Sequence, residues 1–239
     1  MQPEQVHKTT HTERPRKVSM QIKLRERLQN LKMLAGLANF IKHPGSLDSV
    51  LAIASSVKDS PIAEQMMRHL LENPEFAQLV KEGWRPEHID LHALQDLPEG
   101  TLGRCYADQL LSLGITPETL IDPSPITSDG EYVTHRLKET HDIIHVLTGF
   151  GIDGDSELGL QGFNLAQTRS PLAVMLIFGG MLSALQEDEP LGPMLRALAR
   201  GFQMGLDADL VIARKLEEGW DRPLLDWRRE LKLPTEIPA

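Results

Sequence analysis

Two histidines spaced four residues apart are the part of the sequence best suited to chemistry. His141 and His145 lie one turn apart if this stretch is helical, so that both rings project from the same face. Asp142 follows the first histidine, and Glu157 lies beyond a glycine-rich turn, where the next helix is expected to begin. Imidazole nitrogens and carboxylate oxygens are ligands for zinc and other divalent ions. We therefore predict a metal site formed by His141, Asp142, His145 and Glu157.

Each of these residues also has an ordinary structural interpretation. A histidine pair at this spacing occurs on helix surfaces and in satisfied cores, and Glu157 could be a first-turn acid stabilised by the helix dipole. Asp142 lies about 100° around the helix from His141, so it would reach the ion, bridge to it through water, or orient a ligand from behind. Mixed nitrogen and oxygen ligands favour zinc but also accept magnesium, manganese or iron.

Three other metal and phosphate motifs do not fit. A His-Glu-x-x-His peptidase needs a glutamate where this chain has Asp142. A calcium loop beginning at Asp153 would need a glycine at Leu158 and a closing glutamate at Asn164. The glycine-rich stretches 149–154 and 179–180 are followed by no lysine, so they do not match a phosphate-binding loop.

The elements that must position these residues are predicted to be helices. Apolar residues recur at helical spacing, and period-two alternation of useful length is absent, so we predict an all-α fold. Ser128 or Asp129 should begin the helix that carries both histidines, and this helix should end near Gly149. The other helices are expected at about 20–41, 46–57, 61–71, 76–81, 101–113, 157–168, 171–185, 193–204, 207–218 and 223–231.

The chain divides into a short arm and one larger unit. Residues 1–19 are polar without periodicity, which predicts a disordered arm. Residues 20–239 are expected to form a single all-helical domain. Within it, the Asp-Pro-Ser-Pro stretch at 122–125 separates a front half of short helices, 20–121, from a metal-bearing back half, 128–232.

Composition narrows the classes of partner and compartment. The 239 residues carry a net charge of −9, which argues against a nucleic-acid partner. Cys105 is the single cysteine, so an intramolecular disulfide and a cysteine zinc site are excluded, and a buried, inert thiol in a reducing compartment is expected. No signal peptide is apparent. The longest apolar run, 171–185, is shorter than the ~20 residues that span a bilayer, so no transmembrane helix is predicted.

The apolar run at 171–185 has almost no polar face. Ordinary burial in the core is the default interpretation, and the alternative is an apolar cavity or groove that holds a hydrocarbon tail. Such a groove beside a metal ion would suit an amphiphilic substrate. Lys23, Arg25, Arg27 and Lys32 make the first helix basic, either as a solvated face or as a contact with anionic lipid headgroups.

The spacing of the predicted ligands resembles a family signature. The pattern consists of His141-Asp142-x-x-His145, eleven further residues and then Glu157. It resembles the signature of the family of the protein numbered four in coenzyme Q (ubiquinone) biosynthesis. Stretches 97–103 and 218–224 and the pair Tyr132-x-x-x-Arg136 agree with the same family. The resemblance covers residue 84 to the end well and 20–83 loosely.

The resemblance implies an all-helical fold, a divalent metal held by His141, Asp142, His145 and Glu157, and peripheral attachment to the membrane where quinones are made. It further implies C1 decarboxylation, with or without an oxidant, of a polyprenylated 4-hydroxybenzoate intermediate. The family's eukaryotic members carry an organellar leader that is not seen here, so a bacterial, cytoplasmic-face location is expected.

Three functions remain open at this point. The first is a metal-dependent enzyme that uses His141, His145 and Glu157. The second is a non-catalytic scaffold that binds a polyprenyl lipid and recruits other quinone-biosynthesis proteins, and the third is a metal-dependent hydrolase acting on a prenyl phosphate. A homodimer is expected only on general grounds.

Overall fold

The computed structural model describes residues 31–42, 46–58, 60–86, 89–114 and 125–236. Within these residues every regular element is a helix, which confirms the predicted all-α fold; an isolated bridge joins Thr101 and Pro223. The predicted arm 1–19 and most of the predicted boundary at 122–125 lie outside the described residues.

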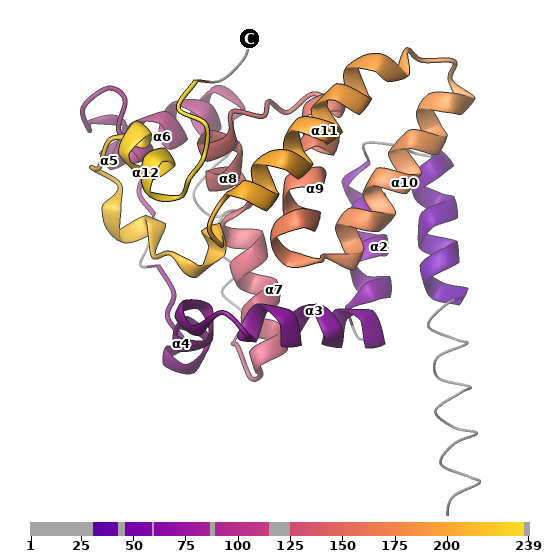
Figure 1. The fold of residues 1–239 in the computed structure, drawn as a ribbon, viewed down its shortest axis with the longest axis horizontal. Coiled ribbons are helices and arrows are strands. Elements are labelled where there is room, and N and C mark those ends of the chain that lie inside the picture. Colours follow the sequence, from indigo (N-terminus) through magenta and orange to yellow (C-terminus); the bar gives the residue numbers. More distant parts are fainter. Residues whose placement is uncertain (1–30, 43–45, 59, 87–88, 115–124, 237–239) are drawn as a thin grey trace, which may run out of the picture.

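The helices of the described residues are arranged as Figure 1 shows. Residues 31–42 are helical at the start of the described chain. The later elements are α2 (Leu47–Val57), α3 (Pro61–Leu71), α4 (Pro74–Glu82), α5 (Leu91–Gln95), α6 (Leu102–Ser112), α7 (Asp129–Glu139), α8 (His141–Thr148), α9 (Gly154–Thr168), α10 (Pro171–Gln186), α11 (Leu191–Asp207), the 3₁₀ helices η2 (Val211–Ala213) and η3 (Leu216–Gly219), and α12 (Leu224–Glu230).

Most helix starts are set by a capping side chain that the sequence displays. Ser60 accepts a hydrogen bond from the Ala63 amide directly before Pro61, and Ser170 does the same before Pro171. Helices α3 and α10 therefore begin where predicted. Asp153 caps α9 through the Ser156 amide, so this helix begins at Gly154, three residues before the predicted start at Glu157.

The predicted helix carrying both histidines is instead two helices. α7 ends at Glu139 and α8 begins at His141, with Thr140 between them. The Thr140 hydroxyl donates a hydrogen bond of 2.7 Å to the Arg136 carbonyl, four residues back. This back-bonding competes with the helical ladder and bends helices. His141 and His145 still share one helix, and Gly149 ends it in the left-handed conformation, close to the predicted end.

The predicted helix at 207–218 is wrong. Asp207 is the last residue of α11 rather than a cap, and η2 and η3 follow. The amide of the buried Gln167 side chain donates to the carbonyls of Gly205 and Ala208 and accepts from the Val211 amide. Because a side chain takes these backbone groups, an α-helical ladder cannot use them.

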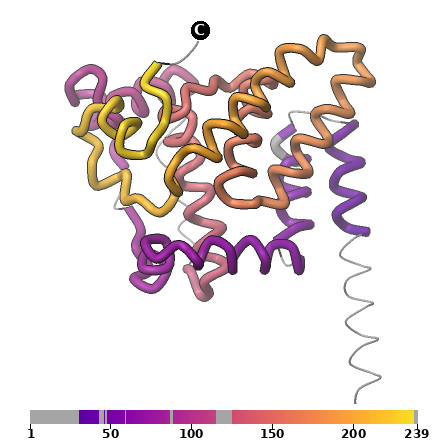
Figure 2. The backbone as a smooth tube through the Cα atoms, in the orientation of Figure 1, coloured from indigo at the N-terminus to yellow at the C-terminus, as the bar shows by residue number. Residues whose placement is uncertain are grey.

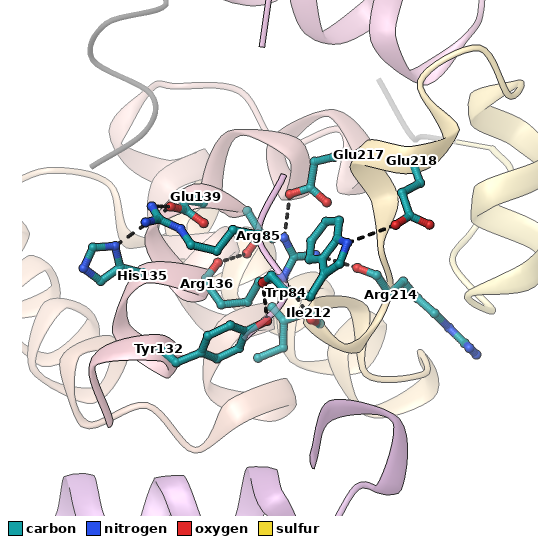
Figure 3. Close-up of polar contacts among 11 residues, drawn as sticks. Trp84, Arg85, Tyr132, His135, Arg136, Glu139, Ile212, Arg214, Glu217 and Glu218 are labelled. Carbon is teal, nitrogen blue, oxygen red and sulfur yellow. Dashed lines mark hydrogen bonds and ion pairs between the residues drawn. The ribbon is translucent and has the colours of Figure 1, made fainter. Parts of the chain in front are cut away.

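A buried arginine holds the next part of this segment. Arg136 is 2% exposed, and its guanidinium donates to the carbonyls of Ile212 and Arg214 and pairs with Glu217. It also lies 5.1 Å from the centre of the Trp84 ring (Figure 3). The motif Tyr132-x-x-x-Arg136 is thereby explained structurally, because the Tyr132 hydroxyl donates to the Trp84 carbonyl.

Helices α9 and α11 approach each other backbone to backbone, and α10 connects them (Figure 2). A Cβ at Gly201 would lie 1.9 Å from the Gly159 carbonyl oxygen, and one at Gly205 would lie 2.7 Å from the Phe163 carbonyl oxygen. No larger residue fits at Gly201 without separating the helices. α9 is therefore held firmly against α11.

The central core contains residues from both halves of the chain. Leu70, Phe76 and Leu102 of the front half share one buried cluster with Ile143 and Phe163 of the back half. α8 lies in this cluster, and six of its eight residues are buried. Among the described residues, no helix is long and apolar enough to cross a membrane.

Candidate metal centre

Three of the four predicted ligands converge at one point. His141, His145 and Glu157 each offer a ligand atom, and these atoms all lie within 4.8 Å of one another. The Nε2 atom of His145 is 3.3 Å from Nε2 of His141 and 3.3 Å from Oε1 of Glu157. The two rings meet edge to face, with their centres 4.8 Å apart.

The orientation of His145 is fixed from behind. Its Nδ1 atom lies 3.0 Å from the Phe150 carbonyl oxygen. A carbonyl can only accept, so Nδ1 carries the proton and donates. In the neutral ring, Nε2 then presents its lone pair toward His141 and Glu157. Gly149, with φ +72°, turns the chain so that the Phe150 carbonyl faces back to the ring.

Glu157 is supplied by the first turn of α9. Its amide bonds to the Asp153 carbonyl at 2.8 Å, inside the capped turn, so the position of its Cα is set by the helix start. The His145 side chain is 2% exposed and the Glu157 side chain 38% exposed. The cluster therefore has a closed histidine side and an open carboxylate side.

The charges in the cluster act on the two rings in opposite directions. Burial lowers the pKa of His141, and the neighbouring His145 lowers it further, against the opposing effects of Asp142 and Glu157. Burial also acts to lower the pKa of His145, but the hydrogen bond and charge of Glu157 outweigh it, and the net pKa is raised. His145 is thus the ring that interacts more strongly with the carboxylate.

Asp142 is not a member of the converging group. Its carboxylate nevertheless acts to raise the pKa values of both histidines and, after burial, that of Tyr106. This is the behaviour of a nearby charge behind the ligand atoms.

Elsewhere, Cys105 is half-buried, and burial raises the pKa of its thiol, in keeping with the expected inert cysteine.

The donor set fits a divalent ion. Two ligand atoms about 2.1 Å from a tetrahedral zinc lie ~3.4 Å apart, close to the two separations of 3.3 Å. Two imidazoles and one carboxylate are a donor set found in catalytic zinc sites, which leave a position for water or substrate. When His145 is neutral, the lone pair on its Nε2 faces the carboxylate oxygen of Glu157 at 3.3 Å. Two lone pairs this close need a proton or a cation between them.

Two grooves of the described surface lie away from the cluster. One of about 370 Å³ is lined by the C-terminal ends of α3, α9 and α11, and one of about 340 Å³ lies between α4 and residues 213–215. No ligand of the cluster lines either groove. The apolar groove beside the metal therefore stays a prediction.

The fold and site together define a class: an all-helical protein with a His-His-carboxylate cluster built on two successive helices. Residues 18–236 match the family described as coenzyme Q (ubiquinone) biosynthesis protein Coq4. The match covers most of the sequence, and the chain belongs to this family, as the motif resemblance predicted.

Individual relatives agree with this assignment. The chain is 29% identical over 211 residues to the mitochondrial ubiquinone biosynthesis protein COQ4 homolog of Rattus norvegicus, covering 85% of this chain and 78% of the relative. It is 28% identical to the mitochondrial COQ4 of Coprinopsis cinerea, covering 84% and 70%. A crystal structure of a Nostoc punctiforme chain described as a ubiquinone biosynthesis protein has a TM-score of 0.76 at 30% identity, over 84% of this chain and 97% of that chain.

Sequence reasoning missed the residues that hold the ligands in place. Phe150 contributes through a backbone carbonyl, which carries no side-chain signal, and its position depends on Gly149. The sequence predicts a helix end and a turn at Gly149, but not the orientation of the carbonyl that follows. Gly159 and Gly201 were not singled out, although a helical glycine that costs stability relative to alanine indicates close packing.

Proposed function

We propose that this member of the ubiquinone biosynthesis family is a metal-dependent enzyme that removes the C1 carboxyl group of a polyprenylated 4-hydroxybenzoate. The observation that carries the proposal is the convergence of His141, His145 and Glu157, with the ligand-facing nitrogen of His145 fixed by its own hydrogen bond. The open carboxylate side of the cluster would leave room for a substrate to reach the ion.

The ion would act as a Lewis acid that binds a carboxylate or phenol oxygen and stabilises developing negative charge. His141 and His145 would supply neutral nitrogen ligands and Glu157 an anionic one, with Asp142 as a fourth ligand or a charge behind them. In the redox-neutral reaction the C1–carboxyl bond breaks, carbon dioxide leaves, and C1 takes a proton. In the oxidative form the carboxyl group also leaves as carbon dioxide, one atom of molecular oxygen becomes a hydroxyl group at C1, and the other is reduced to water with two electrons and two protons from an external reductant.

The test uses purified full-length protein loaded with zinc, magnesium, manganese or iron and supplied with a prenylated 4-hydroxybenzoate, with and without oxygen. Release of carbon dioxide that requires both His145 and the ion supports the enzyme. Absence of release with every metal and with the native substrate would remove it. His145→Ala should abolish turnover but keep lipid copurification.

An apolar outer face supports attachment to a membrane. The outer apolar face comprises exposed residues of α10 and of the adjoining helical segment 31–42. On α10, Val174 and Phe178 are four residues apart and Leu185 follows seven later, so they share one side. Leu31 and Leu34 are each 62% exposed, and Phe40 of the same segment packs beside Gly179 of α10. We infer a peripheral association with the membrane that holds the prenylated substrate.

The outer apolar face also supports the alternative, a scaffold that binds a polyprenyl lipid and other quinone-biosynthesis proteins. Under that alternative, the ion serves structure or headgroup binding. The scaffold is supported if the His145→Ala variant remains folded, still copurifies lipid and partners, and restores quinone synthesis in a host that lacks this protein.

A prenyl-phosphate hydrolase, the third function, would release phosphate instead of carbon dioxide. The same face could also join two copies as a homodimer, which sedimentation of detergent-free protein would measure.

A further inference from the structure

Phe150 contacts three different parts of the site through two different groups. Its backbone carbonyl accepts the proton of His145 Nδ1, and its ring contacts α9 and α11. We propose that the Phe150 ring is a positioning device: by fixing this residue it fixes the tautomer and direction of His145 and hence the metal-binding geometry. The inference rests on the proposed metal site and adds residues outside the ligand set.

The backbone part of the device is fully enclosed. Phe150 is 2% exposed, and its amide donates a long 3.5 Å hydrogen bond to the Thr148 hydroxyl. Gly149, in the left-handed conformation, precedes it. Neither contact by itself prevents a rotation of the Phe150 peptide plane, which would turn the carbonyl away from His145. The ring must provide the remaining restraint.

The ring is held on two sides. The guanidinium carbon of Arg200, on α11, lies 4.2 Å from the ring centre, a cation–π contact. On α9, the space beside Gly159 is filled by the ring: a Cβ there would lie 2.4 Å from Cε1 and 2.9 Å from Cδ1 of Phe150. Gly159 is two residues after Glu157, so the ring packs on the helix that supplies the carboxylate ligand.

Gly159 lies in the backbone contact between α9 and α11, and Arg200 lies next to it in the sequence of α11. Gly201 follows Arg200 and touches the Gly159 carbonyl. The ring thus packs against α9 and α11 at the point where these helices contact each other. Because the ring holds Phe150 in place, the Phe150 carbonyl stays directed at His145. A ligand histidine whose second nitrogen donates to a fixed carbonyl keeps one tautomer, and loss of such a partner typically weakens metal binding 10–100-fold.

The decisive comparison uses two glycines with equivalent surroundings. In Gly159→Ala the new methyl group must displace the Phe150 ring. In Gly179→Ala, on α10, it must displace another phenylalanine ring, because a Cβ there would lie 2.5 Å from Cδ1 of Phe40. Both variants place a methyl group against a ring edge from a helical glycine, so a general loss of packing affects both. Only the first is adjacent to the metal cluster.

Two readouts are taken on each full-length variant. The first is the ¹⁵N spectrum of the histidine rings in metal-free protein, recorded at a pH above the raised pKa of His145 so that this ring is neutral, which reports whether its proton is on Nδ1. The second is zinc affinity from competition with a chelating dye. Gly159→Ala should lose the single Nδ1-protonated signal and bind zinc at least ~10-fold more weakly. Gly179→Ala should keep the signal and bind zinc within about twofold of the starting protein.

Further variants keep the test decisive if Gly159→Ala does not fold. Arg200→Met removes the cation from the ring without adding an atom against it, and Arg196→Met removes an exposed arginine from the same helix as the control. Arg200→Met should weaken zinc binding and broaden the His145 signal, whereas Arg200→Lys, which retains the positive charge, should restore part of both.

The outcomes separate this inference from the proposed function. An unchanged His145 signal in both Gly159→Ala and Arg200→Met, or equal changes in Gly159→Ala and Gly179→Ala, would overturn the positioning role. If the starting protein binds no zinc, magnesium, manganese or iron, the proposed function fails, while the metal-free ¹⁵N spectrum still decides whether the ring sets the tautomer.

Discussion

Glu157 is the ligand whose contribution can be measured with least disturbance of the fold. Its side chain is 38% exposed, whereas that of His145 is 2% exposed. Glu157→Gln preserves the shape and removes the anionic oxygen, so we expect metal affinity to fall at least ~10-fold while stability changes by no more than ~0.5 kcal/mol. Isothermal titration with zinc and urea unfolding measure the two effects.

Two neighbouring carboxylates provide the controls for this change. Asp155→Asn removes a charge from the same first turn of α9 but no member of the cluster, so the metal affinity should be kept. Asp142→Asn should have an intermediate effect if the carboxylate acts from behind the ligands. A loss as large as that of Glu157→Gln would make Asp142 a direct ligand, and a larger loss in Asp155→Asn would indicate a general electrostatic effect.

For individual residues, the sequence predicts the side chains that converge but not the groups that orient them. The His-x-x-x-His spacing and the position of Glu157 after the turn were sufficient to predict that the three side chains meet. The structure adds that Asp142 stands outside the group and that Phe150 orients His145. These two facts depend on side-chain directions and on a backbone carbonyl, which spacing along a helix does not determine.

The position of Glu157 depends on the contact between α9, which carries this residue, and α11. In Gly201→Ala, the added Cβ would lie 1.9 Å from the Gly159 carbonyl oxygen, so the helices must separate. We expect a loss of ~1–3 kcal/mol or more of unfolding free energy, measured by urea, together with weaker metal binding. Gly192→Ala, at the start of α11, meets only the Arg196 side chain at 3.5 Å and should be neutral or stabilising by up to ~1 kcal/mol. Equal losses in both variants would contradict the special role of the contact.

The buried pair of Arg136 and Glu217 joins α7 to the segment after α11. Arg136→Met would leave the Glu217 carboxylate buried and unpaired, and would leave two backbone carbonyls without a donor. We expect a loss of ~3–5 kcal/mol, measured by thermal and urea unfolding. The double variant with Glu217→Gln should recover part of this loss because the unpaired charge is gone. A double variant less stable than Arg136→Met alone would refute the explanation.

Element boundaries were predicted well where local chemistry sets them. The starts of α3 and α10 follow from a serine cap before proline, and Gly149 ends α8. Predictions failed where distant side chains decide. Gln167 and Arg136 take the backbone groups of residues 205–214, and they lie 38 to 78 positions away along the chain. No local pattern indicates such contacts, so the continuous helix predicted from 207 was wrong.

On the scale of the whole molecule, the outer apolar face is the proposed contact with the membrane. The double variant Phe178→Ser, Leu185→Ser should reduce cosedimentation with vesicles containing anionic lipid, with unfolding free energy nearly unchanged, because both side chains are at least half exposed. Leu206→Ser, at an exposed leucine of α11 outside this face, is the control. Equal vesicle binding by all three proteins would exclude the face as the membrane contact.

The backbone contact between α9 and α11 has a kinetic consequence. Amide protons near Gly159 and Gly201 can exchange with deuterated water only when the two helices part, so their exchange should follow global unfolding. Those of segment 31–42, where Leu31 and Leu34 are exposed, should exchange through small local openings.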